Sequence, residues 1–363
     1  MPHHPTPLKF VGTPWYSLVM GLCGLSLAWH RATPLMGEMA GAAALVLGAL
    51  ATMVFAVLAV VTVARMRRHP EAWAEDLRHP VRHPFVAAIP ISLMLLATVS
   101  VALRGPDTLA QGLWWVGSLS QLWVTVWVLS RWWRGNQAGG LQWATVTPAL
   151  FIPIVGNVLA PLAGVPLGHS EWATAQFGIG LLFWPVVLVM LLVRVTVAGL
   201  WPERLRPAVF ILIAPPAVIG LAVLQLGAPV DVAWGLWGVA LFCFLWAGSQ
   251  ARAIASQPFA VPHWGLSFPL AAFAALTLRL ATPGSMLAVV GPVLLALATL
   301  VICVLVLGTV HGLPLAGLRT CEIPNTGINR LRWVDGTLHI EQWADATHLD
   351  GLPPQPSTAT EER

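Results

Sequence analysis

Charged residues are scarce in this chain of 363 residues, and that scarcity excludes most soluble folds. Only 9% of the residues are Asp, Glu, Lys or Arg, whereas ordinary soluble domains carry roughly 25%. Hydrophobic residues make up 57% of the chain, and the mean hydropathy is +0.76. The composition therefore predicts an all-α integral membrane protein without a large soluble catalytic domain.

Acidic residues are absent from the middle of every long apolar run, because all fifteen lie in loops, at run ends or in the C-terminal tail. This distribution argues against a cation pump and against proton coupling through a carboxylate, since both generally need an ionisable group within the membrane. The chain also lacks a nucleophile–base pair, a metal-ligand cluster and a nucleotide motif. We therefore expect no enzymatic activity, no metal, no cofactor and no binding of nucleic acid.

Long uncharged runs are what the chain has instead, and each is long enough to cross a bilayer as a helix. The ten runs of twenty residues or more span residues 10–30, 39–64, 83–103, 108–130, 135–170, 172–193, 207–230, 232–251, 253–278 and 280–318. The fifth run is too long for one helix, so we expect its helix at about 144–166. The predicted domains are an N-terminus (1–9), a ten-helix transmembrane domain (10–311) and a partly disordered C-terminal tail (312–363).

The basic residues indicate the direction of each crossing, because Lys and Arg concentrate in cytoplasmic loops. With a cytoplasmic N-terminus, sixteen of the nineteen basic residues lie on the inner side, and only Arg31, Arg104 and Arg279 lie outside. The alternation holds at every loop. We therefore expect both termini, and with them the tail, in the cytoplasm.

Prolines recur in step with the predicted helices. Short outer and longer inner connections group the ten runs as five hairpins. The first run of each hairpin carries proline, at positions Pro14, Pro90, Pro148 and Pro153, Pro215 and Pro216, and Pro269. The second runs at 39–64, 108–130 and 232–251 carry none, the exceptions being Pro185 and Pro292. Kinked helices are tolerated where they face protein or water, so we expect an inner ring of five kinked helices. The alternative is that prolines are simply common in membrane helices.

Polar side chains within the runs are few and mostly uncharged. We expect most of them to hydrogen-bond between helices; they are Gln111, Ser118, Ser120, Gln121, Thr125, Asn157 and Gln225. Arg279, near the outer end of the ninth run, either snorkels to the interface or attracts anions to a pore mouth. Phe268, next to Pro269, either packs against a neighbouring helix or closes a pore by steric blockade and dewetting.

A series of short motifs gives the chain a family resemblance that extends from about residue 10 to residue 310. The motifs are GLSLAW (24–29), HPVRHPFVAAIP (79–90), TPALFIPIVGN (147–157), FWPVVL (183–188), RPAVFILIAPPAV (206–218), LWGVALF (236–242) and SFPLAA (267–272). In this order they resemble the tellurite-resistance/dicarboxylate transporter family. That family includes bacterial TehA-type proteins, yeast malate permeases and the slow-type anion channels of plant guard cells.

The resemblance implies ten helices in five hairpins around a central pore, with one pore in each subunit of a homotrimer. It also implies a phenylalanine in the ninth helix that occludes the pore, and Phe268 stands at the matching position. The kinks at Pro90, Pro153, Pro215, Pro216 and Pro269 would then shape the lining. The expected function is passive transport of small inorganic or organic anions across a bacterial inner membrane, associated with tellurite resistance.

Two other functions remain open at this point. The first is a secondary carrier of C4-dicarboxylates such as malate, which would need alternating access and a substrate-binding arginine, either Arg194 or Arg279. The second is a membrane-embedded enzyme or sensor whose output is the tail, and the absence of catalytic motifs argues against it.

The chain departs from the family pattern in two places. Trp184 occupies a position where some bacterial relatives carry glutamate, which removes any role of an acidic side chain there. The tail has no recognised counterpart; within it, LRWVDGTLHIEQW (331–343) predicts two short strands about a turn. We expect the tail to be a cytoplasmic appendage, a regulatory or assembly role being the alternative.

Overall fold

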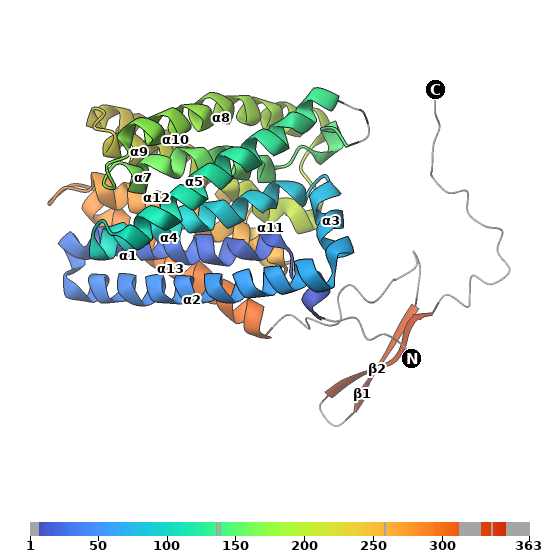
Figure 1. Cartoon of the computed structure of the whole chain (residues 1–363). Coiled ribbons are helices and arrows are strands. Elements are labelled where there is room, and N and C mark those ends of the chain that lie inside the picture. The colour runs from blue at the N-terminus through green and yellow to red at the C-terminus, as the bar shows by residue number, and fades with distance from the viewer. Residues whose placement is uncertain are drawn as a thin grey trace. The chain divides into compact units, whose positions relative to one another are not determined.

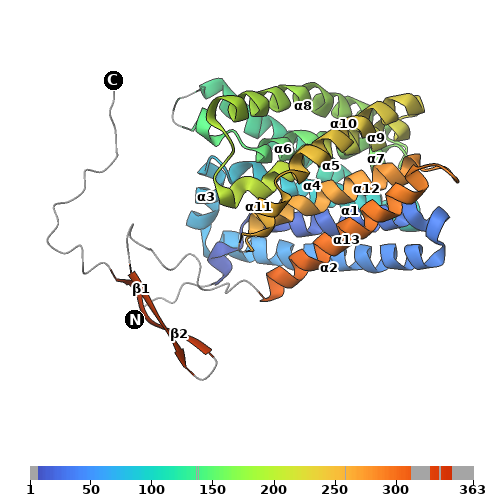
Figure 2. The ribbon, with the colours of Figure 1, turned by 180° about the vertical axis from the view of Figure 1, so that it is seen from behind.

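Helices account for almost all of the chain that the computed structural model describes, which is residues 7–135, 137, 139–257, 259–311, 328–334 and 337–345. Val11–Leu313 forms one compact unit, a bundle of helices that lie side by side (Figures 1 and 2). Within the described residues, eight helical segments are long and apolar enough to cross a membrane. They are Glu38–Arg68, His83–Arg104, Thr108–Arg134, Ser170–Ala198, Glu203–Gln225, Val230–Gly248, Val261–Leu280 and Leu287–Thr309.

Two of the ten predicted spans do not meet this criterion. The first run corresponds to α1 (Ser17–Met36), which extends beyond the predicted end at residue 30 and includes His30 and Arg31. The fifth run contains the shorter apolar helix Pro148–Gly164, which is divided into several pieces. The number of ten spanning helices therefore stays a prediction for these two segments.

Five segments, here called the proline-bearing segments, begin as 3-10 helix and continue as α-helix. They are η2 (Thr13–Tyr16) with α1, η3 (His83–Ala87) with α4 (Ala88–Arg104), η6 (Pro148–Leu150) with α6 (Phe151–Val155), η7 (Gly156–Leu159) and α7 (Ala160–Gly164), η8 (Glu203–Ile213) with α9 (Ala214–Gln225), and η9 (Val261–Leu266) with α12 (Ser267–Leu280). In α4, α6, α9 and α12 the third α-helical residue is proline.

This placement changes the meaning of the predicted kinks. The first amides of an α-helix have no acceptor within that helix, so a proline at the third position removes no α-helical hydrogen bond. Pro90, Pro153, Pro216 and Pro269 thus lie where 3-10 geometry gives way to α geometry. Rather than bending one continuous helix, these prolines stand at a change of helix type.

Five other helices, here called the continuous helices, follow the proline-bearing segments in turn. They are α2 (Glu38–Arg68), α5 (Thr108–Leu129), α8 (Ser170–Ala198), α10 (Val230–Gly248) and α13 (Leu287–His311). Pro185 lies inside α8 and Pro292 inside α13. Each continuous helix contacts the segment that precedes it. The remaining short helices are η1 (Pro7–Phe10), α3 (Pro70–Arg78), η4 (Ser130–Arg134), η5 (Trp143–Thr145) and α11 (Ala251–Ala255).

The proline-bearing segments also contact one another. α1 packs against α4, and α4 packs against η7 and α7. These two helices pack against α9, α9 packs against α12, and α12 packs against α1. The five proline-bearing segments therefore form a closed ring of contacts, here called the contact cycle.

A cluster of charges joins several helices at the end of the bundle where α2 ends and α4 begins. Arg65 of α2 forms an ion pair with Asp76 of α3 at 2.7 Å, and both side chains are 3% exposed. Arg82 bonds to the other oxygen of Asp76 at 2.5 Å and also pairs with Glu75. Arg131, from η4, donates to the carbonyl of Leu77. These contacts fix α3 across the ends of three neighbouring segments.

The strands predicted in the tail are present. β1 (Ile328–Val334) pairs antiparallel with β2 (Thr337–Asp345), and the register places Val334 opposite Thr337. This hairpin belongs to a unit separate from the compact unit Val11–Leu313. The rest of the predicted tail and residues 1–6 of the predicted N-terminus lie outside the described residues, so the domain limits stay predictions.

Candidate functional site

Phe268 lies at the start of the α-helical part of the last proline-bearing segment. It is the second residue of α12, between the 3-10 turn of η9 and Pro269. The side chain is buried, with 8% of its surface exposed. A Cβ placed on Gly24 of α1 would lie 3.0 Å from Cδ2 and 3.5 Å from Cε2 of the ring. The edge of the ring therefore rests against α1 at a glycine, where a Cβ would make a tight contact with it.

A second glycine on α1 lets the first turn of α12 approach closely. A Cβ on Gly21 would lie 2.4 Å from Oγ of Ser267, the residue before Phe268. That hydroxyl donates to the carbonyl of Trp264 at 2.7 Å, and this hydrogen bond holds the Ser267 side chain at the contact. Gly21 and Gly24 lie three residues apart and share one face of α1. Together they form the surface on which Ser267 and Phe268 pack.

The other proline-bearing segments have no aromatic ring at the position of Phe268. The second α-helical residue is Ile89 in α4, Ile152 in α6 and Pro215 in α9. Leu18 holds this position in α1, which has no proline at the third. Among these segments only α12 therefore carries a ring there.

The five predicted proline sites are all buried and occupy matching positions. Pro90, Pro153, Pro216 and Pro269 are third residues of their α-helices, and Pro215 is a second residue. The segments that carry these prolines contact one another. Their predicted role in a pore lining remains a prediction.

Side chains from α5 complete the hydrogen bonding around Pro153, where α6 passes into η7. Nε2 of Gln121 donates to the carbonyl of Pro153 at 2.8 Å, and Oγ1 of Thr125 donates to the same oxygen at 2.7 Å. Nδ2 of Asn157 then donates to Oγ1 of Thr125 at 2.8 Å. All three side chains are fully or almost fully buried. A carbonyl at a change of helix type thus receives donors from a neighbouring helix.

The same network extends to α8 through residues that the sequence reading missed. Gln176 donates from Nε2 to Oδ1 of Asn157 at 3.2 Å and accepts from Oγ of Ser118 at 2.6 Å. Nε1 of Trp172 donates to Oγ of Ser118 at 2.8 Å. The predicted interhelical hydrogen bonding is confirmed for Ser118, Gln121, Thr125 and Asn157. An amide within an apolar run is the signal that points to Gln176.

Two arginines lie near the C-terminal ends of α1 and α12. Arg279 is exposed near the end of α12, and Arg31 lies in α1 close enough for the two positive charges to repel each other. Arg104, also predicted on that side, pairs with Asp107 at 3.1 Å. The end of the α1–α12 pair thus carries two neighbouring positive charges. Such charges raise the local concentration of anions.

Arg194 and Trp184, the other residues that the sequence singled out, both lie on α8. Arg194 is buried, and its Nη1 donates to the carbonyl of Gly199 at 2.9 Å. Trp184 is partly buried. Among the described residues, no group of three His, Cys, Asp or Glu side chains lies close enough together to hold a metal ion.

Known proteins match almost the whole helical part of the chain. Residues 11–310 match a family model described as voltage-dependent anion channel. The tellurite resistance protein TehA homolog of Haemophilus influenzae is 27% identical over 273 residues, which cover 74% of this chain and 80% of the relative. The S-type anion channel SLAH3 of Arabidopsis thaliana is 26% identical over 279 residues, covering 76% of this chain and 43% of the relative. For SLAH2 of the same plant the identity is 28% over 213 residues, covering 58% and 40%. The chain thus spans less than half the length of these plant relatives.

Proposed function

Because the chain belongs to the family of voltage-dependent anion channels, we propose that it conducts small anions passively through a pore that Phe268 closes. The permeating species are small inorganic anions such as chloride and nitrate, or small organic anions. The observation that carries this proposal is the buried ring of Phe268 against Gly24, at the junction of two segments of the contact cycle.

The pore runs between the five proline-bearing segments, with the continuous helices outside them as the partners in five hairpins. The contact cycle through α1, α4, α7, α9 and α12 supports this arrangement. The higher burial of the proline-bearing segments supports it as well. In this proposal the chain crosses the membrane ten times, with α1 and Pro148–Gly164 as the two spans that hydropathy alone does not identify.

Anion preference follows from the charges along the proposed path. The long apolar runs carry no carboxylate at their centres, and Arg31 and Arg279 add positive charge at one mouth. A permeating anion therefore meets no repelling group in the membrane and an attracting one at the entrance. Selection among anions then depends on size and on the cost of dehydration.

Replacing Phe268 by alanine is the direct test of the gate. We expect anion currents of Phe268→Ala in planar bilayers to exceed those of the wild type on the order of tenfold, the change that corresponds to a barrier lower by about 1.4 kcal/mol. Phe273→Ala is the matched control, because Phe273 lies on the same helix and packs against Trp237 and Phe244 of α10. Its currents should stay at the wild-type level.

The same wild-type and Phe268→Ala proteins, studied in bilayers and in vesicles, distinguish a channel from a carrier. If neither the wild type nor Phe268→Ala conducts, and labelled malate enters vesicles with saturation, a C4-dicarboxylate carrier replaces the channel. In that case Arg279→Gln should lower the uptake, since the carrier needs a cation for the two carboxylates.

Four further properties complete the proposal, and three of them have a separate test. Both termini lie in the cytoplasm, as the distribution of basic residues indicates, and cysteine labelling from either side checks this. The bacterial plasma membrane and the homotrimer come from the family resemblance, and native mass spectrometry checks the trimer. A role in tellurite resistance is suggested by the name of the Haemophilus relative, and growth of a deletion strain on tellurite checks it.

A further inference from the structure

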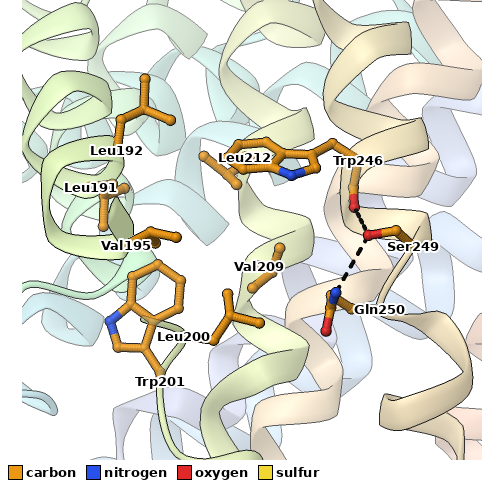
Figure 3. A pocket seen from close by; sticks show the side chains of 10 residues that line it. All are labelled: Leu191, Leu192, Val195, Leu200, Trp201, Val209, Leu212, Trp246, Ser249 and Gln250. Carbon is orange, nitrogen blue, oxygen red and sulfur yellow. Dashed lines mark hydrogen bonds between the residues drawn. The ribbon is translucent and has the colours of Figure 1, made fainter. Parts of the chain in front are cut away.

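An apolar pocket opens between two continuous helices, and the proposed conduction path makes no use of it. Its walls come from the last turns of α8 and α10, and its floor comes from η8 and from Trp201 in the connection after α8 (Figure 3). The pocket volume is about 210 Å³. Leu192 and Val195 lie on one wall, and Trp246 lies on the opposite wall.

The outer part of the pocket is exposed at the surface of the helical unit. Leu192 and Trp246 on the walls are 38% and 39% exposed, whereas Leu212 and Trp201 on the floor are 5% and 3% exposed. Both walls belong to helices that are long and apolar enough to cross a membrane. The medium around such helices is lipid, so the molecules that reach this opening are lipid chains. The aliphatic and indole lining matches the chemistry of a hydrocarbon chain.

A buried positive charge lies next to the floor. The guanidinium carbon of Arg194 is 5.9 Å from the centre of the Trp201 ring, and the arginine is 8% exposed. One of its amino groups donates to the carbonyl of Gly199, but its Nε is buried without a hydrogen-bond partner among the described residues. Nor does Arg194 form an ion pair with a described carboxylate. A buried cation without a counter-charge is costly, and an anionic group beside it would offset that cost.

Further arginines lie close in the sequence to residues that line the pocket, Arg204 after Trp201 and Arg252 after Gln250. Arg204 is exposed in η8, and Arg252 is exposed in α11, which follows α10. Arg206 pairs with Glu203 at 3.6 Å. Arginine and tryptophan collect where membrane helices reach the head groups. Basic pockets between membrane helices bind anionic lipid head groups.

We propose that this pocket holds one acyl chain of an anionic glycerophospholipid, with the phosphate of the same lipid next to Arg194. The apolar part of the site binds the chain, and the arginine selects a negatively charged head group over a neutral one. Charge complementarity is the reason to expect this occupant rather than a second copy of the protein. The proposal stands whether or not the protein conducts anions.

The test uses the full chain in lipid nanodiscs and two photoreactive lipids. Phosphatidylglycerol and phosphatidylcholine carry the same diazirine group on one acyl chain, and mass spectrometry locates the labelled residues. We expect phosphatidylglycerol to label the peptides that contain Leu192, Val195 and Trp246, on the order of tenfold more than phosphatidylcholine does, which corresponds to about 1.4 kcal/mol of preference. Arg194→Gln should reduce this preference to near one while labelling by phosphatidylcholine stays unchanged.

A second test fills the pocket with larger side chains. Val195→Trp and Ser249→Trp insert an indole from opposite walls, and each should abolish labelling of the Trp246 peptide. Val197→Trp is the matched control, because Val197 lies on the same helix, is 72% exposed and does not line the pocket. Size-exclusion profiles like that of the wild type show that each variant is folded, and having two filling variants keeps the test valid if one fails.

Three results would overturn the proposal. The first is equal labelling by the two lipids in the wild type. The second is unchanged labelling in both filling variants. The third is an oligomer, seen by native mass spectrometry, that Val195→Trp dissociates while Val197→Trp does not, because a second copy of the protein would then occupy the pocket.

Discussion

The proline-bearing segments and the continuous helices are both strongly apolar, yet they occupy different environments. In His83–Arg104, Glu203–Gln225 and Val261–Leu280 between 67% and 78% of the most apolar window is buried. In the spans built on the five continuous helices the buried share is 17% to 39%. Hydropathy therefore does not tell a helix that faces lipid from one that faces protein. Proline at the third α-helical position marks four of the five proline-bearing segments, whereas glycines at close contacts occur in both sets, for example Gly24 in α1 and Gly180 in α8.

This comparison teaches how the bundle uses irregular backbone. A 3-10 turn leaves backbone groups in poorer geometry than an α-helix does, which is tolerable in a membrane only where protein supplies partners. The carbonyl of Pro153 shows the solution, since Gln121 and Thr125 from a continuous helix donate to it. The continuous helices need no such help and can face lipid.

The largest expected effect on stability comes from cutting the charged link between the two sets. Asp76 pairs with Arg65 of continuous helix α2 and with Arg82 next to proline-bearing η3. Asp76→Ala removes the carboxylate that neutralises the charge of buried Arg65, and we expect a loss of about 3–5 kcal/mol in the free energy of unfolding. Thermal unfolding in detergent measures it. Glu71→Ala removes an exposed carboxylate of the same helix α3 and should change the stability little. If both variants lost the same stability, the buried ion pairs of Asp76 would not be what stabilises this end of the bundle.

The next effect tests the support of the irregular backbone. Gln121→Ala removes a donor to Pro153 and leaves polar groups buried without partners, so we expect a loss of about 1–3 kcal/mol. The control is Ser130→Ala, just after the end of α5, which removes only an exposed hydroxyl that donates to the carbonyl of Trp127. A Gln121→Ala protein as stable as the Ser130→Ala protein would show that the network contributes nothing.

A single added methyl group sharpens the comparison between the two sets. Gly24→Ala places a Cβ 3.0 Å from the Phe268 ring and 3.2 Å from Cβ of Ala271, so we expect a loss of about 1–3 kcal/mol from overpacking. The ring must also move, so the anion current should change as well. Gly178→Ala in α8 meets nothing within 4 Å. Because alanine favours helix, this control should be neutral or stabilising by up to about 1 kcal/mol.

The last prediction concerns the prolines themselves and has the opposite sign. Pro185 interrupts the interior of α8, so Pro185→Ala restores a backbone hydrogen bond and should stabilise the protein by up to about 3 kcal/mol. Pro269 is a third helical residue, so Pro269→Ala restores no such bond and loses buried contacts of the ring. Thermal unfolding of both variants measures these changes in stability. A larger gain in stability for Pro269→Ala than for Pro185→Ala would refute the explanation that proline at the third helical position removes no hydrogen bond of the α-helix.

Several features of the fold were predictable from local chemistry. Eight predicted spans match helices of the expected length, and the strands around residues 331–343 are present, because hydropathy and alternation act over short distances. The broken helix at Pro148–Gly164 was not predictable as such, since the side chains that sustain it come from α5 and α8. The surroundings of Phe268 could not be predicted from spacing either, because Gly24 lies on a helix far away in the chain.

What the sequence by itself determined is a membrane protein with long apolar runs and with prolines in alternate runs, while the direction of each crossing stays a prediction. These properties depend on the free energy of transfer of each side chain between water and lipid, which is a property of the residue and its near neighbours. Only the tertiary structure decided which helices are buried, where 3-10 geometry becomes α geometry and which side chains meet Phe268 and Arg194. Those outcomes depend on contacts between distant segments, where one glycine or one amide decides how closely two helices approach.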